Sequence, residues 1–213
     1  MPSPLLPIEP LLPERLMARQ DESDDAQFYA MPRLVTHVDD ATIASLTQLY
    51  RELVPAGARV LDLQSSWVSH LPADVAYARV VGHGMSEPEL AQNPRLDAHV
   101  VQDLNRTPEL PFDDASFDVA LNAFSMQYLV RPVEVLRSVR RVLAPGGAHL
   151  VALSHRMFPT KAIAVWPVLE MADRARWVGV YFRLAGGWSS PEIVDRSPSG
   201  ADPLWLVVAR RDG

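Results

Sequence analysis

The feature that most constrains the fold is an alternation of short apolar runs with helical segments, which begins at residue 59. Seven runs rich in Val, Leu or Ile predict buried strands at 59–63, 79–81, 98–101, 118–121, 149–153, 193–196 and 204–209. Strand, helix and strand in succession imply a mostly parallel sheet with helices on both faces. The last two runs are joined by a short loop, which predicts an antiparallel edge at the C-terminal end of the sheet.

Capping residues, prolines and glycines mark the helices between these strands. The predicted helices are 40–54 with Asp39 or Asp40 as N-cap, 133–143 opened by Pro132 and closed by Gly146 and Gly147, a short segment near 160–166, and 173–184 with Asp173 as N-cap. The fold class predicted from this pattern is α/β.

The composition changes near residue 38 and divides the chain into an arm and one folded domain. Residues 1–13 contain five prolines, which disfavour a helix and predict an extended segment. We expect residues 1–38 to form a proline-rich arm that caps the crevice of a single domain at 39–213, because its apolar side chains Phe28, Tyr29, Met31 and Leu34 lie outside any predicted strand or helix. A length of 213 residues fits one domain with such an appendage.

Composition and charge exclude several classes of function. The net charge is −6 and no stretch is strongly basic, so nucleic acid is not an expected partner. No apolar run is long enough to cross a bilayer, and no positive charge precedes the first apolar residues, so neither a membrane span nor a signal peptide is predicted and a cytoplasmic location is expected. The chain has no cysteine, and its six histidines show no metal-ligand spacing, so no metal site is predicted.

Ligands of open parallel sheets bind beyond the carboxyl ends of the strands, so the segments that follow the predicted strands are candidates for a site. The segment after the first strand has no glycine, which disfavours a dinucleotide or phosphate loop. Gly84 and Met85 follow the second strand, Asp103 and Leu104 the third, and Asn122 the fourth.

Two stretches carry a resemblance to a known family: LPFDDASFDVA at 110–120 and VRRVLAPGG at 139–147. With residues 60–63 as the first strand, they resemble the class I S-adenosylmethionine-dependent methyltransferase superfamily over about residues 40–155. The resemblance implies a Rossmann-like seven-stranded sheet, mostly parallel with an antiparallel C-terminal edge strand, and S-adenosylmethionine as cofactor with S-adenosylhomocysteine as product. Three further segments, PRLVTH at 32–37, SSWVSHLP at 65–72 and FPTKAI at 158–163, resemble a subgroup of methyltransferase-like proteins from bacteria and plastids.

The same resemblance implies which residues contact the cofactor. Asp103 matches the residue that binds the adenine amino group, and Met85 and Leu104 match positions on either side of the ring. Typical members have a glycine-rich loop after the first strand and an acidic residue where Gly84 stands, so this chain departs from the pattern at both places. The expected cofactor-binding residues are Asp62, Ser65, Ser66, Trp67, Gly84, Met85, Asp103, Leu104 and Asn122.

Two arrangements of the loop after the first strand are open. Either the hydroxyls of Ser65 and Ser66 replace the glycine contacts to the amino-acid end of the cofactor, or Trp67 fills the cavity. Asp103 favours the first arrangement, because a filled cavity would bury its carboxylate without a partner.

His37 and His155 are the candidate general bases. His37 lies between the arm and the first helix of the domain, and His155 follows the fifth strand at the mouth of the crevice. The structural alternative for each is a hydrogen-bonding surface histidine. Lys161 is the only lysine of the chain and is expected to face an anion, such as the carboxylate of a ligand.

The function predicted from these observations is S-adenosylmethionine-dependent methyl transfer to a small-molecule acceptor. The alternative is a non-catalytic or regulatory binding protein with a remodelled cofactor site, which Gly84 and the glycine-free loop favour. A third interpretation keeps the nucleoside as a structural ligand for chemistry other than methylation. Calorimetric titration with S-adenosylmethionine separates the second from the other two.

Overall fold

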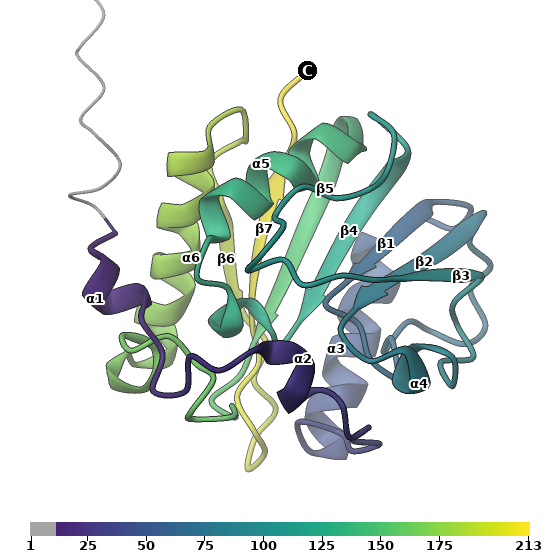
Figure 1. The fold of residues 1–213 in the computed structure, drawn as a ribbon. Coiled ribbons are helices and arrows are strands. Elements are labelled where there is room, and N and C mark those ends of the chain that lie inside the picture. Colours follow the sequence, from purple (N-terminus) through teal and green to yellow (C-terminus); the bar gives the residue numbers. More distant parts are fainter. Residues whose placement is uncertain (1–11) are drawn as a thin grey trace, which may run out of the picture.

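The computed structural model describes residues 12–213, which form a seven-stranded sheet with helices on both faces (Figure 1). The strands in chain order are β1 (Arg59–Leu63), β2 (Arg79–Gly84), β3 (Ala98–Val101), β4 (Phe117–Ala123), β5 (Leu143–Leu153), β6 (Glu192–Asp195) and β7 (Trp205–Arg210). Their order in the sheet is β3-β2-β1-β4-β5-β7-β6. The first five strands pair in parallel, and β7 is antiparallel to both β5 and β6. The predicted fold class, with its C-terminal antiparallel pair at the edge, is confirmed.

The strand order reverses between β1 and β4. The chain builds β1, β2 and β3 outward in one direction and then returns to place β4 on the other side of β1. At such a reversal the connections leave in opposite directions and open a crevice at the carboxyl ends of the two strands. The topology therefore fixes where a ligand site is expected.

Six α-helices and two 3-10 helices accompany the sheet in the described part of the chain. They are α1 (Glu14–Met17), α2 (Asp25–Phe28), α3 (Asp40–Leu53), α4 (Glu87–Leu90), η1 (Met126–Tyr128), α5 (Pro132–Val142), η2 (Trp166–Val168) and α6 (Met171–Ala185). Asp39 caps α3 as predicted, since its side chain accepts a hydrogen bond from the Thr42 amide at 2.8 Å. None of these helices is long and apolar enough to span a bilayer.

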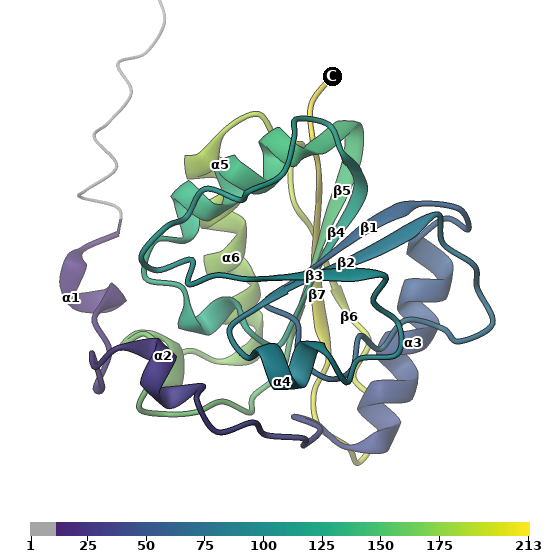
Figure 2. The same ribbon diagram turned by 45° about the vertical axis from the view of Figure 1, so that its right-hand side comes forward.

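The alternation of strand side chains divides the core into two layers. Leu46 and Tyr50 of α3 pack with Val60 and Leu121 on one face of the sheet. On the other face, α5 and α6 cover a second cluster that includes Leu61 of β1. The two views show α3 on one side of the sheet and α5 with α6 on the other (Figures 1 and 2).

Two helix predictions need correction. Residues 160–165 make turns, and the 3-10 helix η2 begins at Trp166, because two amides bond to distant carbonyls: Ile163 N donates to Gln127 O at 3.0 Å and Ala164 N donates to Ala18 O at 2.8 Å. The helix predicted at 173–184 begins at Met171, and Glu170, not Asp173, is its N-cap residue.

The N-terminal arm contains two one-turn helices, α1 and α2, where no regular structure was predicted. In Figure 1 this purple segment runs below the sheet. The exposed fractions of Met31 and Leu34 are 74% and 46%, so these two members of the predicted apolar cluster face solvent. The proline-rich residues 1–11 lie outside the described part of the chain.

Candidate functional site

A cavity lies at the carboxyl ends of β1, β2 and β4, where the strand order reverses. Its empty volume, including the part that opens to solvent, is about 1120 Å³. The loops after these strands and after β3 line it, and Tyr29, Arg33 and His37 of the arm contribute one wall. The cavity is therefore enclosed between the sheet and the N-terminal segment.

Three residues that line the cavity have left-handed backbone conformations although none is glycine. The φ angles are 53° at Gln64, 51° at His70 and 56° at Phe124. Such conformations cost about 1–3 kcal/mol each in residues with a side chain, and they concentrate at functional sites. Gln64 directly follows β1, so the backbone makes the sharp turn there without the expected glycine.

The serine hydroxyls of the loop after β1 are bonded to carboxylates of the protein. Ser65 Oγ donates to Asp62 at 2.6 Å, and Ser66 Oγ donates to Glu89 at 2.6 Å. Trp67 does not line the cavity, because its Nε1 donates to the Val35 carbonyl of the arm at 3.0 Å. The arrangement in which Trp67 fills the cavity is therefore wrong, and Trp67 instead connects the loop to the arm.

The end of β2 has no room for a side chain at Gly84. A Cβ atom there would lie 2.5 Å from the Ser65 carbonyl oxygen and 3.2 Å from the Leu90 side chain. The Ser65 amide is held in place by a 2.7 Å hydrogen bond to the His83 carbonyl. The loop after β1 thus takes the position into which an acidic side chain at residue 84 would project.

Four carboxylates line the cavity, and they differ in their partners. Asp25 forms ion pairs with Arg19 at 2.7 Å and with Lys161 at 3.0 Å. Asp62, Glu89 and Asp103 have no cationic partner among residues 12–213. Burial raises the pKa of Asp62 to about 6, although the Ser65 hydroxyl works in the opposite direction. The cavity therefore presents three carboxylates that form no ion pair with a described residue.

Three imidazoles line the same cavity. Burial lowers the pKa of His37, and burial lowers the pKa values of both His70 and His83 to about 4. The Nδ1 atom of His70 and both ring nitrogens of His83 are buried without a hydrogen-bond partner among the described residues. The rings are neutral at physiological pH.

Aromatic side chains form the wall between the arm and the β4 and β5 loops. The Phe158 ring packs edge-on to His37, with ring centroids 5.6 Å apart, and stacks on Tyr128 at 5.9 Å. The guanidinium of Arg33 lies 4.2 Å from the centre of the Phe28 ring. This wall packs against one side of the His37 ring.

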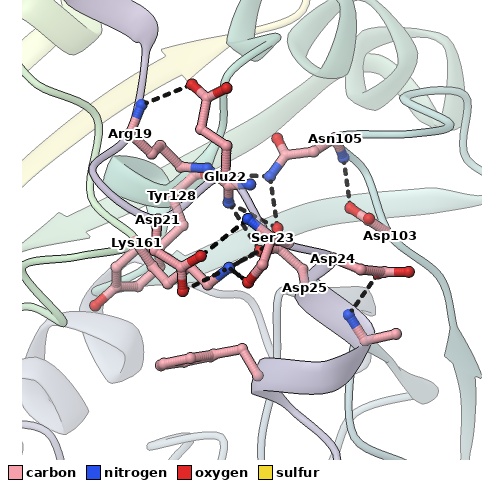
Figure 3. A network of polar contacts seen from close by, with 12 residues as sticks. Arg19, Asp21, Glu22, Ser23, Asp24, Asp25, Asp103, Asn105, Tyr128 and Lys161 are labelled. Carbon is pink, nitrogen blue, oxygen red and sulfur yellow. Dashed lines mark hydrogen bonds and ion pairs between the residues drawn. The ribbon is translucent and has the colours of Figure 1, made fainter.

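A polar network fastens the arm to the rim of the cavity (Figure 3). Lys161 is 1% exposed, and its Nζ lies 3.0 Å from Asp25 and 3.2 Å from Asp21 of the arm. The side-chain amide of Asn105 donates to Asp25 at 3.1 Å, and the backbone amide of Asn105 donates to Asp103 at 2.8 Å. Lys161 therefore faces anions of the protein itself, whereas the sequence analysis expected the carboxylate of a ligand.

The structure gathers most of the predicted site residues in this cavity. It is lined by His37, Asp62, Ser65, Ser66, Gly84, Met85, Asp103 and Leu104. Three predicted residues do not line it. Trp67 contacts the arm, Asn122 is buried and donates to Gln64 at 2.8 Å, and the half-exposed His155 lies 3.4 Å from Asp202.

Sequence reasoning missed Glu89 and Ser86, which both line the cavity. Glu89 lies in a short, acidic segment that is typical of a solvent-exposed helix. A possible signal was its position five residues after Gly84, on the helix that begins beyond β2.

Comparisons with known proteins agree with this architecture. Residues 64–151 match a family model described as a methyltransferase domain. Over 43 residues the chain is 40% identical to the sterol 4-C-methyltransferase strm-1 of Caenorhabditis elegans, a match that covers 20% of this chain and 13% of that protein. The narrower resemblance to a subgroup with SSWVSHLP stays a prediction.

Solved structures of similar fold include two with different descriptions. The [4+2]-cyclase SpnF has a TM-score of 0.59 and 19% identity, with 78% of this chain and 80% of that chain covered. An S-adenosylmethionine dependent methyltransferase from Mesorhizobium loti has a TM-score of 0.55 and 18% identity, with 78% of this chain and 98% of that chain covered. At these identities the likeness establishes the fold alone.

Proposed function

We propose that this protein binds S-adenosylmethionine in the cavity and transfers its methyl group to a small-molecule acceptor. The observation that carries the proposal is the set of three carboxylates, Asp62, Glu89 and Asp103, that line the cavity without a cationic partner in the described chain. S-adenosylmethionine carries a sulfonium and an ammonium group, so these carboxylates supply charge of the opposite sign. The methyltransferase-domain match over residues 64–151 supports the same cofactor.

The residues at the strand ends fit the parts of this cofactor. Asp103 follows β3, and its carboxylate would accept a hydrogen bond from the adenine amino group. Met85 and Leu104 would lie beside the ring. The backbone of the loop that starts at Gln64 would face the amino-acid end, because the hydroxyls of that loop are already bonded to carboxylates. The unpartnered nitrogen of His70 is a further polar atom that a ligand would satisfy.

His37 is the proposed general base of the reaction. The cofactor supplies an electrophilic methyl group, and its in-line transfer needs mainly proximity and an acceptor that loses its proton. The His37 ring lines the cavity, and burial lowers its pKa, so the ring is neutral and able to accept that proton at a ring nitrogen. The Phe158 ring packs edge-on against the imidazole.

Formation of S-adenosylhomocysteine in the presence of pooled small-molecule acceptors tests this assignment. We expect acceptor-dependent product with the wild-type protein. His37→Asn should lower turnover about 10²- to 10⁴-fold while the affinity for S-adenosylmethionine stays the same. His155→Asn is the matched control, because that ring lies outside the cavity beside Asp202. Equal turnover in wild type and His37→Asn would remove His37 from the mechanism.

A second candidate is a binding or regulatory protein without methyltransferase activity. The loop carbonyl that occupies the space beside Gly84 favours it, since an acidic residue at that position is excluded. The cyclase among proteins of similar fold keeps open chemistry other than methylation. Binding of S-adenosylmethionine without its consumption would support chemistry other than methylation. Failure to bind would support a regulatory protein.

A further inference from the structure

We infer that Glu89 and Ser86 hold a vicinal diol of the ligand, which is the pair of ribose hydroxyls in the proposed cofactor. The inference rests on the proposed function and adds the residues that recognise the sugar. In the family that the chain resembles, the acidic residue at the position of Gly84 holds these hydroxyls, and the inference places the carboxylate in the first turn of α4 instead.

The end of β2 cannot supply a carboxylate in this protein. Gly84 has no side chain, and a Cβ there would come within 2.5 Å of the Ser65 carbonyl. That carbonyl belongs to a loop fixed by the hydrogen bond from Ser65 N to His83 O. A carboxylate at this corner of the cavity must therefore come from another segment of the chain.

Glu89 provides such a carboxylate. It is 7% exposed and lines the cavity, and the described part of the chain offers it no cation. One oxygen accepts from Ser66 Oγ at 2.6 Å and the other accepts from Arg33 N at 2.8 Å. These bonds fix the orientation of the carboxylate, and because each oxygen has two lone pairs, each retains one for a ligand hydroxyl.

Ser86 provides an independent observation in the same cavity. It precedes α4, lines the cavity and is 5% exposed. Its Oγ is buried with no hydrogen-bond partner among residues 12–213. Buried hydroxyls are nearly always bonded, so a ligand hydroxyl beside Glu89 would complete the site.

The other carboxylates of the cavity are less suited to this role. Asp62 accepts from Ser65 Oγ at 2.6 Å, and burial raises its pKa to about 6. Asp25 already accepts hydrogen bonds from Arg19, Lys161 and Asn105. Asp103 lies in the loop after β3 and is the proposed adenine contact. Glu87, on the same turn as Glu89, points outward, with its side chain 62% exposed and bonded to His99 at 2.9 Å. Glu87 is therefore a matched control for Glu89.

A binding cycle with two ligands tests the inference. Calorimetry measures the affinity of the full chain for S-adenosylhomocysteine and for its 2′,3′-dideoxy analogue, in wild type, Glu89→Gln, Ser86→Ala and Glu87→Gln. We expect Glu89→Gln to weaken binding of S-adenosylhomocysteine about 10- to 100-fold and to leave binding of the dideoxy analogue within about threefold of wild type. Ser86→Ala should show the same pattern with a loss of about 3- to 10-fold, and Glu87→Gln should match wild type.

The outcomes separate this inference from the proposed function. If wild type binds S-adenosylhomocysteine but Glu89→Gln loses nothing, or loses equally for both ligands, the diol assignment is overturned and the proposed function stands. If Glu89→Gln does not fold, Ser86→Ala decides, because the Ser86 hydroxyl bonds to no described residue and its removal breaks no hydrogen bond among them. Wild-type protein that binds neither ligand would overturn both.

Discussion

The ammonium of Lys161 lies 3.0 Å from the carboxylate of Asp25, and both side chains are buried between the arm and the domain. Burial by itself raises the Asp25 pKa, but the hydrogen bonds from Arg19 and Lys161 outweigh it, and the pKa is lowered. The arm contributes Asp25 and Arg19, whereas the domain contributes Lys161. This ion pair therefore joins the two segments that enclose the cavity.

Lys161→Met should release the arm. Removal of one partner of a buried ion pair costs about 3–5 kcal/mol, and we expect the lower end because Arg19 still neutralises Asp25. The change should accelerate proteolytic cleavage between residues 18 and 38 and lower the melting temperature. Lys161→Met with the cleavage rate of wild type would show that the pair does not hold the arm in place.

Asp62→Asn should stabilise the free protein at high pH. The pKa of Asp62 is about 6 in the folded protein and 3.8 in the unfolded reference, so wild-type stability is complete below pH 3.8 and declines as the pH rises through about 6. The variant does not lose this free energy of unfolding, which amounts to up to about 3 kcal/mol. Urea unfolding of both proteins at pH 4.5 and pH 8 measures their free energies of unfolding. If the difference between variant and wild type does not increase from pH 4.5 to pH 8, the prediction is contradicted.

His149→Leu should reduce sensitivity to acid. This buried histidine of β5 has no hydrogen-bond partner for either ring nitrogen among the described residues, and burial lowers its pKa to about 3. Its unfolded pKa is 6.5, so wild type loses stability as the pH falls below 6.5, by about 2 kcal/mol at pH 5. Chemical unfolding at pH 7 and pH 5 should show a smaller decline for the variant. An identical decline would mean that the ring is already protonated or solvated in the folded protein.

Asp103→Ala should weaken S-adenosylmethionine binding by about 1.5–3 kcal/mol, because a hydrogen bond to a charged group is lost. The melting temperature of the free protein should change little. Asp113→Ala removes an exposed carboxylate outside the cavity and serves as the control. Equal affinities of Asp103→Ala and wild type in calorimetry would remove Asp103 from the cofactor site.

The parts of the fold that depend on local pattern could be predicted from the sequence. β1 and β3 have the predicted boundaries, and α5 begins at Pro132 as expected. The helix expected at 160–166 failed because tertiary hydrogen bonds to residues 18 and 127 replace helical ones, and no local pattern encodes these. The division of the chain at residue 38 stays a prediction.

The candidate site was only partly predictable for a related reason. Strand ends bring Asp62 and Asp103 to one edge of the sheet, and topology alone is enough to place them there. The burial of Glu89 depends on contacts with Ser66 and with Arg33 of the arm, which lies 56 residues earlier. The ion pair of Lys161 likewise joins segments that are far apart in the sequence.

Calorimetric titration of the full chain with S-adenosylmethionine at neutral pH tests the central claim most directly. The unpaired carboxylates of the cavity predict a single site with micromolar affinity, and the affinity should fall in Asp103→Ala and not in Asp113→Ala. Absence of binding to the folded wild-type protein would contradict the account and leave a methyltransferase-like fold that does not use this cofactor.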